Sequence, residues 1–339
     1  MTSKAAVLDP KARTFSVAPM MDWTDKHCRF FHRQLSRHAL LFTEMVTSAA
    51  LIRGGADWLL NYNDDVEHPI AAQLGGSDPT ELAAATALCT TFNYDEINLN
   101  IGCPSDRVQS GKFGACLMAE PELVADCVRA MRDATDKPVT VKCRIGIDDQ
   151  DSETDLRIFV DHMLGAKVDA LYVHARKAWL KGLSPKENRE VPPLDYDRVY
   201  RLKNHVGDLP LMINGGIETL EACHQHLQHV DGVMLGRAAY YNPGLLRGVD
   251  ALFYGDDVPG ISLESLCEVM MNYAEIQMTN GARLNQIVRH MLGLGFGKPG
   301  ARRYRQLLTV EAVKPGASPA LISQAFDILI EGLALAKAS

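Results

Sequence analysis

Residues able to bind or react with a ligand recur where short, β-prone runs of this chain end. Lys142 and Arg144 end one run, His174 ends another, and an Asn-x-Asn-x-Gly-Cys-Pro stretch closing at Pro104 ends a third. In parallel α/β folds the active site lies at the carboxyl ends of the strands. One polar strand end means little, but several that converge on one rim would form an active site. The ends concerned are Ala72–Gly76, Asn98–Pro104, Val141–Gly146, Val173–Arg176, Ile213–Ile217 and Leu235–Ala238.

The last two of these ends have the composition of a phosphate site. Gly215 and Gly216 allow the backbone to approach a ligand closely, and Gly236 with Arg237 precedes a further predicted helix. Loops after the seventh and eighth strands, together with a helix N-terminus, form the usual phosphate site of a (β/α)8 barrel. Arg237 could add a charge-assisted hydrogen bond. The alternative is that these glycines merely turn the chain, but their occurrence on consecutive strands favours phosphate.

The elements that must position these residues alternate between strand and helix. Helix-like segments such as Pro79–Thr91 and Glu120–Thr135 separate the β-prone runs, which predicts a parallel sheet. Eight repeats favour a closed (β/α)8 barrel, an α/β fold, over about residues 1–250. The competitor is a doubly wound open sheet, which usually has fewer strands and a Gly-rich first turn. The predicted strands are Phe15–Pro19, Ala39–Glu44, Ile70–Leu74, Glu96–Ile101, Val139–Arg144, Ala170–His174, Pro210–Asn214 and Gly232–Leu235.

The pattern changes after Tyr241. From Ser262 onward the chain reads as amphipathic helices with a Gly-rich break at Gly293–Gly300, so residues 251–339 are predicted to form a second, all-helical domain.

Composition and charge limit the function classes. The 339 residues are 47% hydrophobic and 23% charged, which is typical of a globular protein, and the formal net charge of −7 means that any polyanion must be held by local basic patches. Gly281–Val310 carries six Arg or Lys residues and no Asp or Glu, and Arg176–Arg189 is a second basic stretch. Such runs are usually solvated faces, but two of them could bind RNA phosphates.

Cysteine and hydropathy patterns point to the cytoplasm. The eight cysteines form no CxxC pair, which favours reduced thiols over a zinc site or a disulfide scaffold. No signal peptide core and no run of about 18 apolar residues is present, so no membrane span is expected. His224, His226 and His229 could suggest a metal site, but they fall on a predicted outer helix, which favours a solvated face. We therefore expect no metal.

Four motifs together resemble the tRNA-dihydrouridine synthase family, over about Phe15 to Leu308. The C-terminal stretches His290–Leu294 and Pro299–Arg305 are similar to the bacterial A-type branch. Of the four motifs, the Asn-x-Asn-x-Gly-Cys-Pro strand end is the most specific. The motifs are Ala18–Asp25, Asn98–Pro104, Gly111–Ala115 and Val141–Gly146.

The resemblance implies a noncovalent FMN in the mouth of the barrel, with residues 251–339 binding tRNA. Pro19, Met20 and Met21 would line the flavin ring, Gln73 would hydrogen-bond it, and Lys142 would stabilise negative charge on the reduced ring. The ribityl chain and phosphate would be held by His174, Asn214, Gly215, Gly216, Gly236 and Arg237.

The implied reaction is reduction of the uracil 5,6 double bond. Flavin nitrogen 5 would deliver hydride to carbon 6, Cys103 would protonate carbon 5, and NADPH would reduce the flavin again. Asn100 and Arg144 would orient a flipped-out uracil. The A-type branch implies uridines 20 and 20a of the D-loop, and no obligate protein partner is expected. The residues implied in orienting tRNA are Lys186, Arg189, Arg302 and Arg305.

Two other function classes fit parts of the pattern. A flavin barrel acting on a free pyrimidine, as in the dihydroorotate dehydrogenases, would share the fold and cofactor site but would need neither the helical domain nor the basic stretches. An RNA-binding module on an inactive barrel is disfavoured by the intact set Cys103, Lys142 and His174.

Overall fold

Eight parallel strands form a barrel in the computed structural model, which describes residues 8–338. Successive strands pair from β2 to β8, and β8 pairs with β1. Leu40, just before β2, bridges back to β1, because Val17 N donates to Leu40 O (2.9 Å) and Leu40 N to Phe15 O (3.0 Å). The ring is therefore closed, which confirms the barrel and excludes the open sheet. The strands are β1 (Phe15–Val17), β2 (Leu41–Thr47), β3 (Ile70–Gly75), β4 (Glu96–Ile101), β5 (Val139–Arg144), β6 (Ala170–His174), β7 (Leu211–Asn214) and β8 (Gly232–Leu235).

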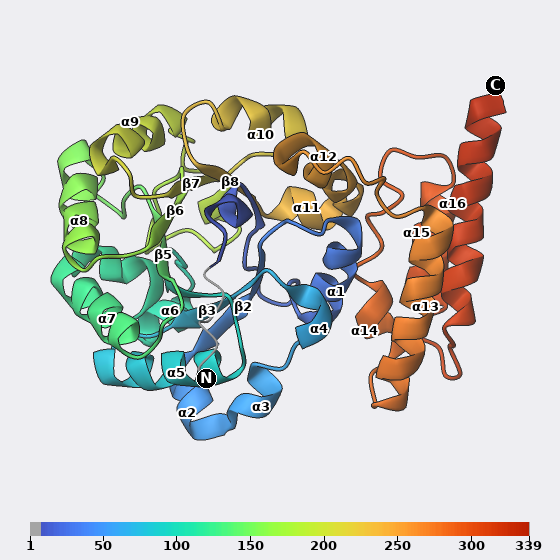
Figure 1. Cartoon of the computed structure of the whole chain (residues 1–339), viewed down its shortest axis with the longest axis horizontal. Helices are drawn as coiled ribbons and strands as arrows, with labels where there is room; N and C mark the ends of the chain where they lie inside the picture. The colour runs from blue at the N-terminus through green and yellow to red at the C-terminus, as the bar shows by residue number, and fades with distance from the viewer. Residues whose placement is uncertain (1–7, 339) are drawn as a thin grey trace. The chain divides into compact units, whose positions relative to one another are not determined.

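Helices return the chain between strands and surround the barrel (Figure 1). Local signals start them: Asp78 caps α5, whose first residue is Pro79, and Ser152 with Asp155 forms a capping box at α8. Because parallel strands need long crossovers, this alternation follows from the strand arrangement. The main outer helices are α2 (Ser48–Gly54), α5 (Pro79–Thr91), α7 (Pro121–Asp133), α8 (Glu153–Gly165), α9 (Tyr196–Val206) and α10 (Leu220–His226).

Large apolar side chains fill the middle of the barrel. Phe42, Tyr172, Met212 and Met234 are fully buried in one cluster, and the rings of Phe42 and Tyr172 meet edge to face at 5.2 Å. A barrel packed at this level is a core rather than a pore, so a ligand must bind at the strand ends.

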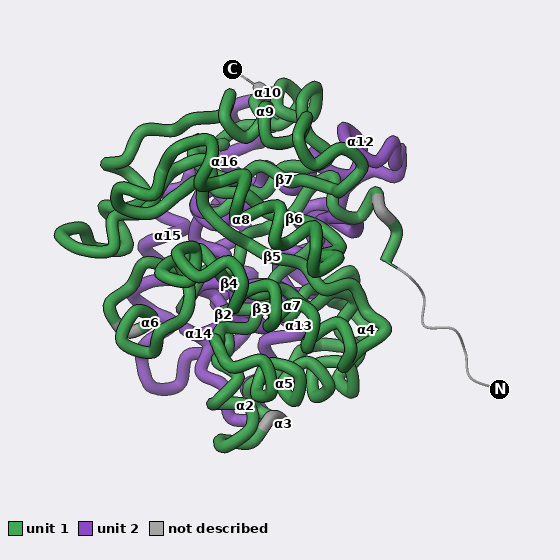
Figure 2. Tube along the Cα trace, turned by 90° about the vertical axis from the view of Figure 1, so that its left-hand side faces the viewer, with its two compact units in different colours: residues 1–21, 40–236 green, residues 22–39, 237–339 purple. Residues whose placement is uncertain are grey.

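The chain divides into two compact units (Figure 2). The first comprises the residues up to Met21 together with Leu40–Gly236, and the second comprises Asp22–Ala39 together with the residues from Arg237 onward. The predicted helices after Ser262 and the break at Gly293–Gly300 are present. The helices of the second unit are α1 (Lys26–Leu35), α11 (Arg237–Tyr241), α12 (Val249–Tyr254), α13 (Leu263–Thr279), α14 (Leu284–Val288), α15 (Ala301–Val310) and α16 (Ala320–Ala338). Among the described helices, none is long and apolar enough to cross a membrane.

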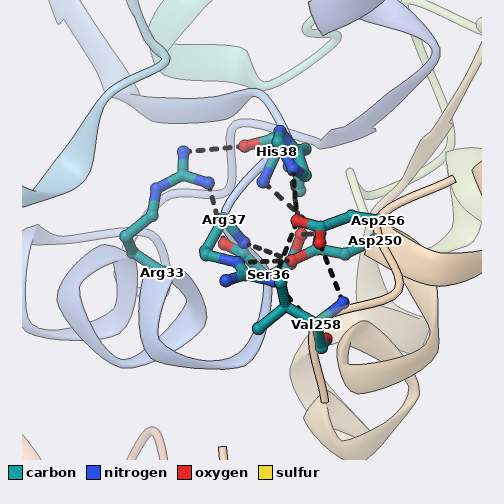
Figure 3. Close-up of polar contacts among 8 residues, drawn as sticks. Arg33, Ser36, Arg37, His38, Asp250, Asp256 and Val258 are labelled. Atoms are coloured by element: carbon teal, nitrogen blue, oxygen red, sulfur yellow. Dashed lines mark hydrogen bonds and ion pairs between the residues drawn. The ribbon is translucent and has the colours of Figure 1, made fainter. Parts of the chain in front are cut away.

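Two carboxylates join the early and late segments of the second unit (Figure 3). Asp250 accepts hydrogen bonds from Ser36 Oγ (2.5 Å) and Arg37 N (2.8 Å). Asp256 pairs with Arg37 Nη2 (2.8 Å) and His38 Nε2 (2.9 Å). Three side chains of this cluster carry atoms of the kinds that bind metal ions, and these atoms lie within 4.8 Å of one another: His38, Asp250 and Asp256. The Arg37 guanidinium pairs with both carboxylates and so offsets their negative charge. The cluster therefore serves to hold the two segments of the second unit together.

Candidate active site

Cys103 lies in a tightly held turn at the carboxyl end of β4, with its side chain partly exposed. Its N–H donates to Asn100 Oδ1 (2.9 Å), and its carbonyl accepts from Ala115 N (2.9 Å). The segment that packs on this turn, residues 111–115, needs a glycine at position 114. Gly114 has φ +75°, and a Cβ there would lie 2.6 Å from Cys103 O. The Gly-rich motif at 111–115 therefore packs against the backbone of the cysteine.

Gln73 and Asn100 are linked beside this turn. Asn100 Nδ2 donates to Gln73 Oε1 (2.9 Å), and Gln73 Nε2 donates to Asn98 Oδ1 (2.8 Å). All three residues are buried, with 9% or less of each residue exposed. Their contacts to flavin or uracil stay predictions, but the structure places both predicted residues at the same strand ends.

Basic groups are concentrated at the ends of β5 and β6. Burial, together with the nearby Arg144, lowers the pKa of Lys142 to about 8, and its Nζ donates to Asn214 Oδ1 (3.0 Å). Burial also lowers the pKa of Arg144 to about 10. Burial and the neighbouring cations hold the pKa of His174 well below its ordinary value, so its ring is neutral. Charges so enclosed are costly without a counter-ion, so this site fits an anionic ligand.

Arg144 connects the end of β5 to two loops. Its Nε donates to Gly102 O (2.8 Å), and its Nη1 donates to Lys177 O (3.2 Å) and Asn188 O (3.1 Å). Its Nη2 makes no hydrogen bond to any residue that the structure describes, which leaves a donor for a ligand.

The loop after β7 has the predicted glycine geometry. Gly215 and Gly216 have φ of +114° and +67°, and Tyr196 Oη donates to Gly215 O (2.8 Å). Consecutive left-handed residues turn backbone N–H groups toward one side, which suits an anion. His174 Nδ1 is buried and has no hydrogen-bond partner among residues 8–338, and its ring lies about 3 Å from where a Gly215 Cβ would be.

The residues predicted to line the flavin ring lie after β1. Pro19 and Met20 are partly buried, and Met21 is 55% exposed. A Cβ on Gly236 would meet Met20 Sδ at 3.7 Å, so the loops after β1 and β8 lie side by side within the first unit.

The basic stretch after β6 is an ordered loop held by one buried asparagine. Asn188 is fully buried; its Oδ1 accepts from Trp179 N (2.8 Å), and its Nδ2 donates to Trp179 O (2.9 Å) and Leu183 O (3.1 Å). Lys186 and Arg189 flank it and are exposed, so their charges face solvent where a polyanion could reach them.

The remaining predicted residues belong to the second unit. Arg237 begins α11. Arg302 and Arg305 are exposed on α15, whose other face buries Tyr304 and Leu308. The structure thus gathers the predicted cofactor and uracil residues of the first unit at its strand ends, and it presents the predicted arginines of α15 to solvent.

Three residues of this site were not predicted from the sequence, and the burial of one histidine outside the site was predicted wrongly. Asn98, Asn188 and Tyr196 were not predicted; only the alternating polar pattern of β4 could have suggested Asn98. The prediction of a solvated face was wrong for His226, which is 7% exposed and whose Nδ1 lies 2.7 Å from Tyr200 Oη. His224 and His229 on the same stretch are exposed as expected.

A closed barrel with reactive and charged groups gathered at the carboxyl ends of its strands is the architecture of (β/α)8-barrel enzymes. Solved structures agree on the fold. The old yellow enzyme homologue from Zymomonas mobilis matches with a TM-score of 0.51 at 12% identity, covering 75% of this chain and 92% of that one. A 2-naphthoyl-CoA reductase matches with a TM-score of 0.54 at 9% identity, covering 70% of this chain and 49% of that one. At these identities the likeness shows the fold alone.

The chain belongs to the dihydrouridine synthase family. The model of that family, described as Dihydrouridine synthase (Dus), matches residues 16–327. A protein of Shewanella oneidensis named tRNA-dihydrouridine(20/20a) synthase is 55% identical over 93% of this chain and 93% of its own length. Proteins of the same name from Salmonella typhi and Escherichia coli are 54% and 53% identical over 94% of this chain and 96% of their own. The family resemblance seen in the sequence is confirmed.

Proposed function

We propose that this protein reduces uridines 20 and 20a in the D-loop of tRNA to 5,6-dihydrouridine, with noncovalent FMN as cofactor and NADPH as reductant. One observation carries the proposal: the partly exposed thiol of Cys103 lies in a rigid turn at the strand ends where Lys142 and Arg144 are enclosed. The relatives named tRNA-dihydrouridine(20/20a) synthase, 53–55% identical over almost the whole chain, support the substrate.

The residues present fit FMN. The unpartnered His174 Nδ1 and the left-handed pair Gly215 and Gly216 suit its phosphate. Lys142 suits the anionic ring of the reduced cofactor, which would offset the cost of enclosing the lysine charge. Asn214, which holds the lysine Nζ and donates to Met234 O (2.7 Å), fixes this donor in place.

Bound FMN supplies the two electrons of the reduction; the chain supplies binding and the proton. Asn100 and Arg144 keep free N–H donors that would hold the uracil carbonyls. Cys103 would deliver its proton to carbon 5 of the pyrimidine, because its backbone is fixed on both sides by hydrogen bonds while its side chain reaches solvent. A base reaches such a site only by leaving its stack, which costs least in a loop of RNA.

Exposed Lys and Arg side chains would bind the tRNA. Lys186 and Arg189 of the first unit and Arg302 and Arg305 of the second would contact phosphates, so a net acidic protein would bind a polyanion through local patches. In this proposal residues 1–250 form the catalytic domain and residues 251–339 the tRNA-binding domain. We place the protein in the cytoplasm, where its reduced cysteines and its substrate would occur together.

The test is direct. Purified protein is incubated with NADPH and unmodified tRNA, and dihydrouridine is located by mass spectrometry. Cys103→Ala is compared with Cys116→Ala, which replaces a partly exposed cysteine whose Sγ donates to Phe113 O (3.2 Å). We expect D-loop dihydrouridine from the wild type and from Cys116→Ala, and a loss of about 100-fold or more in Cys103→Ala. A flavin-loaded wild type that leaves tRNA unmodified but reduces free pyrimidines would overturn the proposal.

A further inference from the structure

One strand of the barrel carries polar side chains on its inner face. Glu96, Asn98 and Asn100 alternate along β4, so all three point the same way, and all three are buried. The strand register places Gln73 of β3 on one side of Asn98 and Thr140 of β5 on the other. Five polar side chains from three strands therefore share one face.

These side chains form one continuous chain of hydrogen bonds, here called the amide chain. Thr140 Oγ1 donates to Glu96 Oε1 (2.7 Å), and Asn98 Nδ2 donates to Thr140 Oγ1 (2.8 Å). Gln73 Nε2 donates to Asn98 Oδ1 (2.8 Å), and Asn100 Nδ2 donates to Gln73 Oε1 (2.9 Å). Every link donates toward Glu96, so the bonds polarise one another in the same direction.

Both ends of the amide chain have only one possible polarity. Glu96, paired with Arg13 at 2.7 Å, can only accept. Thr140 must then donate to it and accept from Asn98, which in turn settles the orientation of the next two amides. At the other end, the backbone N–H groups of Gly102 (3.1 Å) and Cys103 (2.9 Å) can only donate to Asn100 Oδ1. The two ends agree, so the buried carboxylate at the start of β4 and the N–H groups of the cysteine turn both favour the same orientation of the Asn100 amide.

We propose that Glu96, Thr140 and Asn98 are positioning residues that act through the amide chain on Cys103. They touch neither substrate nor cofactor in this role; they keep the Asn100 oxygen on the Cys103 amide and so hold the thiol where it must deliver its proton. The inference rests on the proposed function for the role of Cys103 itself.

Thr140→Val tests this in the flavin-loaded enzyme, because it removes one hydroxyl at nearly constant shape and so breaks the first two links of the amide chain, Thr140 to Glu96 and Asn98 to Thr140. We expect reoxidation of the reduced flavin by tRNA to slow about 10- to 100-fold, and Thr140→Ser to restore it to within about twofold. In a Cys103→Ala background the same Thr140→Val change should slow the residual rate by no more than about twofold, because the group it positions is already absent.

The outcomes separate the two proposals. Equal slowing in both backgrounds would show that Thr140 acts on the fold, or through Gln73 and Asn100 on the flavin and the uracil, and it would overturn the positioning of Cys103, as would an undiminished Thr140→Val enzyme. A wild type whose reduced flavin is not reoxidised by tRNA would overturn the proposed function instead.

A second measurement needs no variant. In the isotope-labelled wild type, the side-chain amide protons of Gln73, Asn98 and Asn100 should exchange with solvent far more slowly than those of exposed asparagines such as Asn204 and Asn272. Exchange at the exposed rate would overturn the amide chain even if Thr140→Val failed to fold.

Discussion

Replacing Tyr196 by Phe would remove one hydroxyl from behind the candidate phosphate loop. Tyr196 begins α9, and its Oη donates to Gly215 O at 2.8 Å. Its ring also packs edge to face on His226 at 4.5 Å, a contact that Phe retains. The change therefore leaves the packing and frees the carbonyl of a residue whose left-handed conformation orients the following N–H groups.

The size of the effect follows from one hydrogen bond. A net contribution of about 0.5–1.5 kcal/mol corresponds to about a 2- to 13-fold change in an equilibrium constant. Without the Tyr196 hydrogen bond, FMN would have to order the loop when it binds. The free energy spent on ordering the loop would lower the affinity for FMN. We expect FMN to bind Tyr196→Phe about 2- to 13-fold more weakly, and riboflavin, which has no phosphate, to bind it as it binds the wild type.

The assay is a fluorescence titration of flavin-free protein with FMN and with riboflavin. Tyr200→Phe is the matched control, because the Tyr200 hydroxyl lies against His226 Nδ1 rather than against the loop. Equal weakening of both flavins would refute the role assigned to Tyr196. A wild type that does not distinguish FMN from riboflavin would refute the phosphate site itself.

Three further predictions concern charge. The pKa of Lys142 is about 8 against an ordinary 10.5, so its charged form costs stability at pH 7, and this cost fades as the pH rises toward 10.5. In urea titrations, Lys142→Met should therefore raise the free energy of unfolding of the flavin-free protein by about 1–3 kcal/mol at pH 7 and by less at pH 10. The same variant should lose tRNA reduction. Burial would raise the pKa of Asp25, but His290 and other donors hold it well below its ordinary value of 3.8 in the folded protein. Asp25→Ala should therefore cost about 1–2 kcal/mol of stability at pH 7. The difference should shrink as the pH falls below about 4, because the unfolded chain then takes up a proton at Asp25 that the folded carboxylate does not; an equal difference at pH 3 would contradict this. Arg302→Gln and Arg305→Gln should each weaken tRNA binding and lower its salt dependence by about one unit of slope without changing FMN affinity; an unchanged slope would remove them from the tRNA contact.

The sequence by itself determined the fold and the strand ends at which the candidate site is proposed. Each predicted strand is present because the apolar runs, their lengths and the intervening helical segments are local signals. Cys103 and Lys142 could be placed on one rim because the carboxyl ends of parallel strands must lie on the same side of a barrel. Gly215 and Gly216 were identifiable because few other residues adopt their backbone conformation.

Only the tertiary structure decided how that site is supported. The links among Glu96, Thr140 and Gln73 depend on the register of three strands, which no single stretch of sequence encodes. The burial of His226 depends on the packing of α10 against α9. The backbone of Asn188 is reached by Arg144 at the end of β5, 44 residues earlier in the chain. These contacts join residues that local patterns treat independently, so their geometry emerges only when the barrel closes.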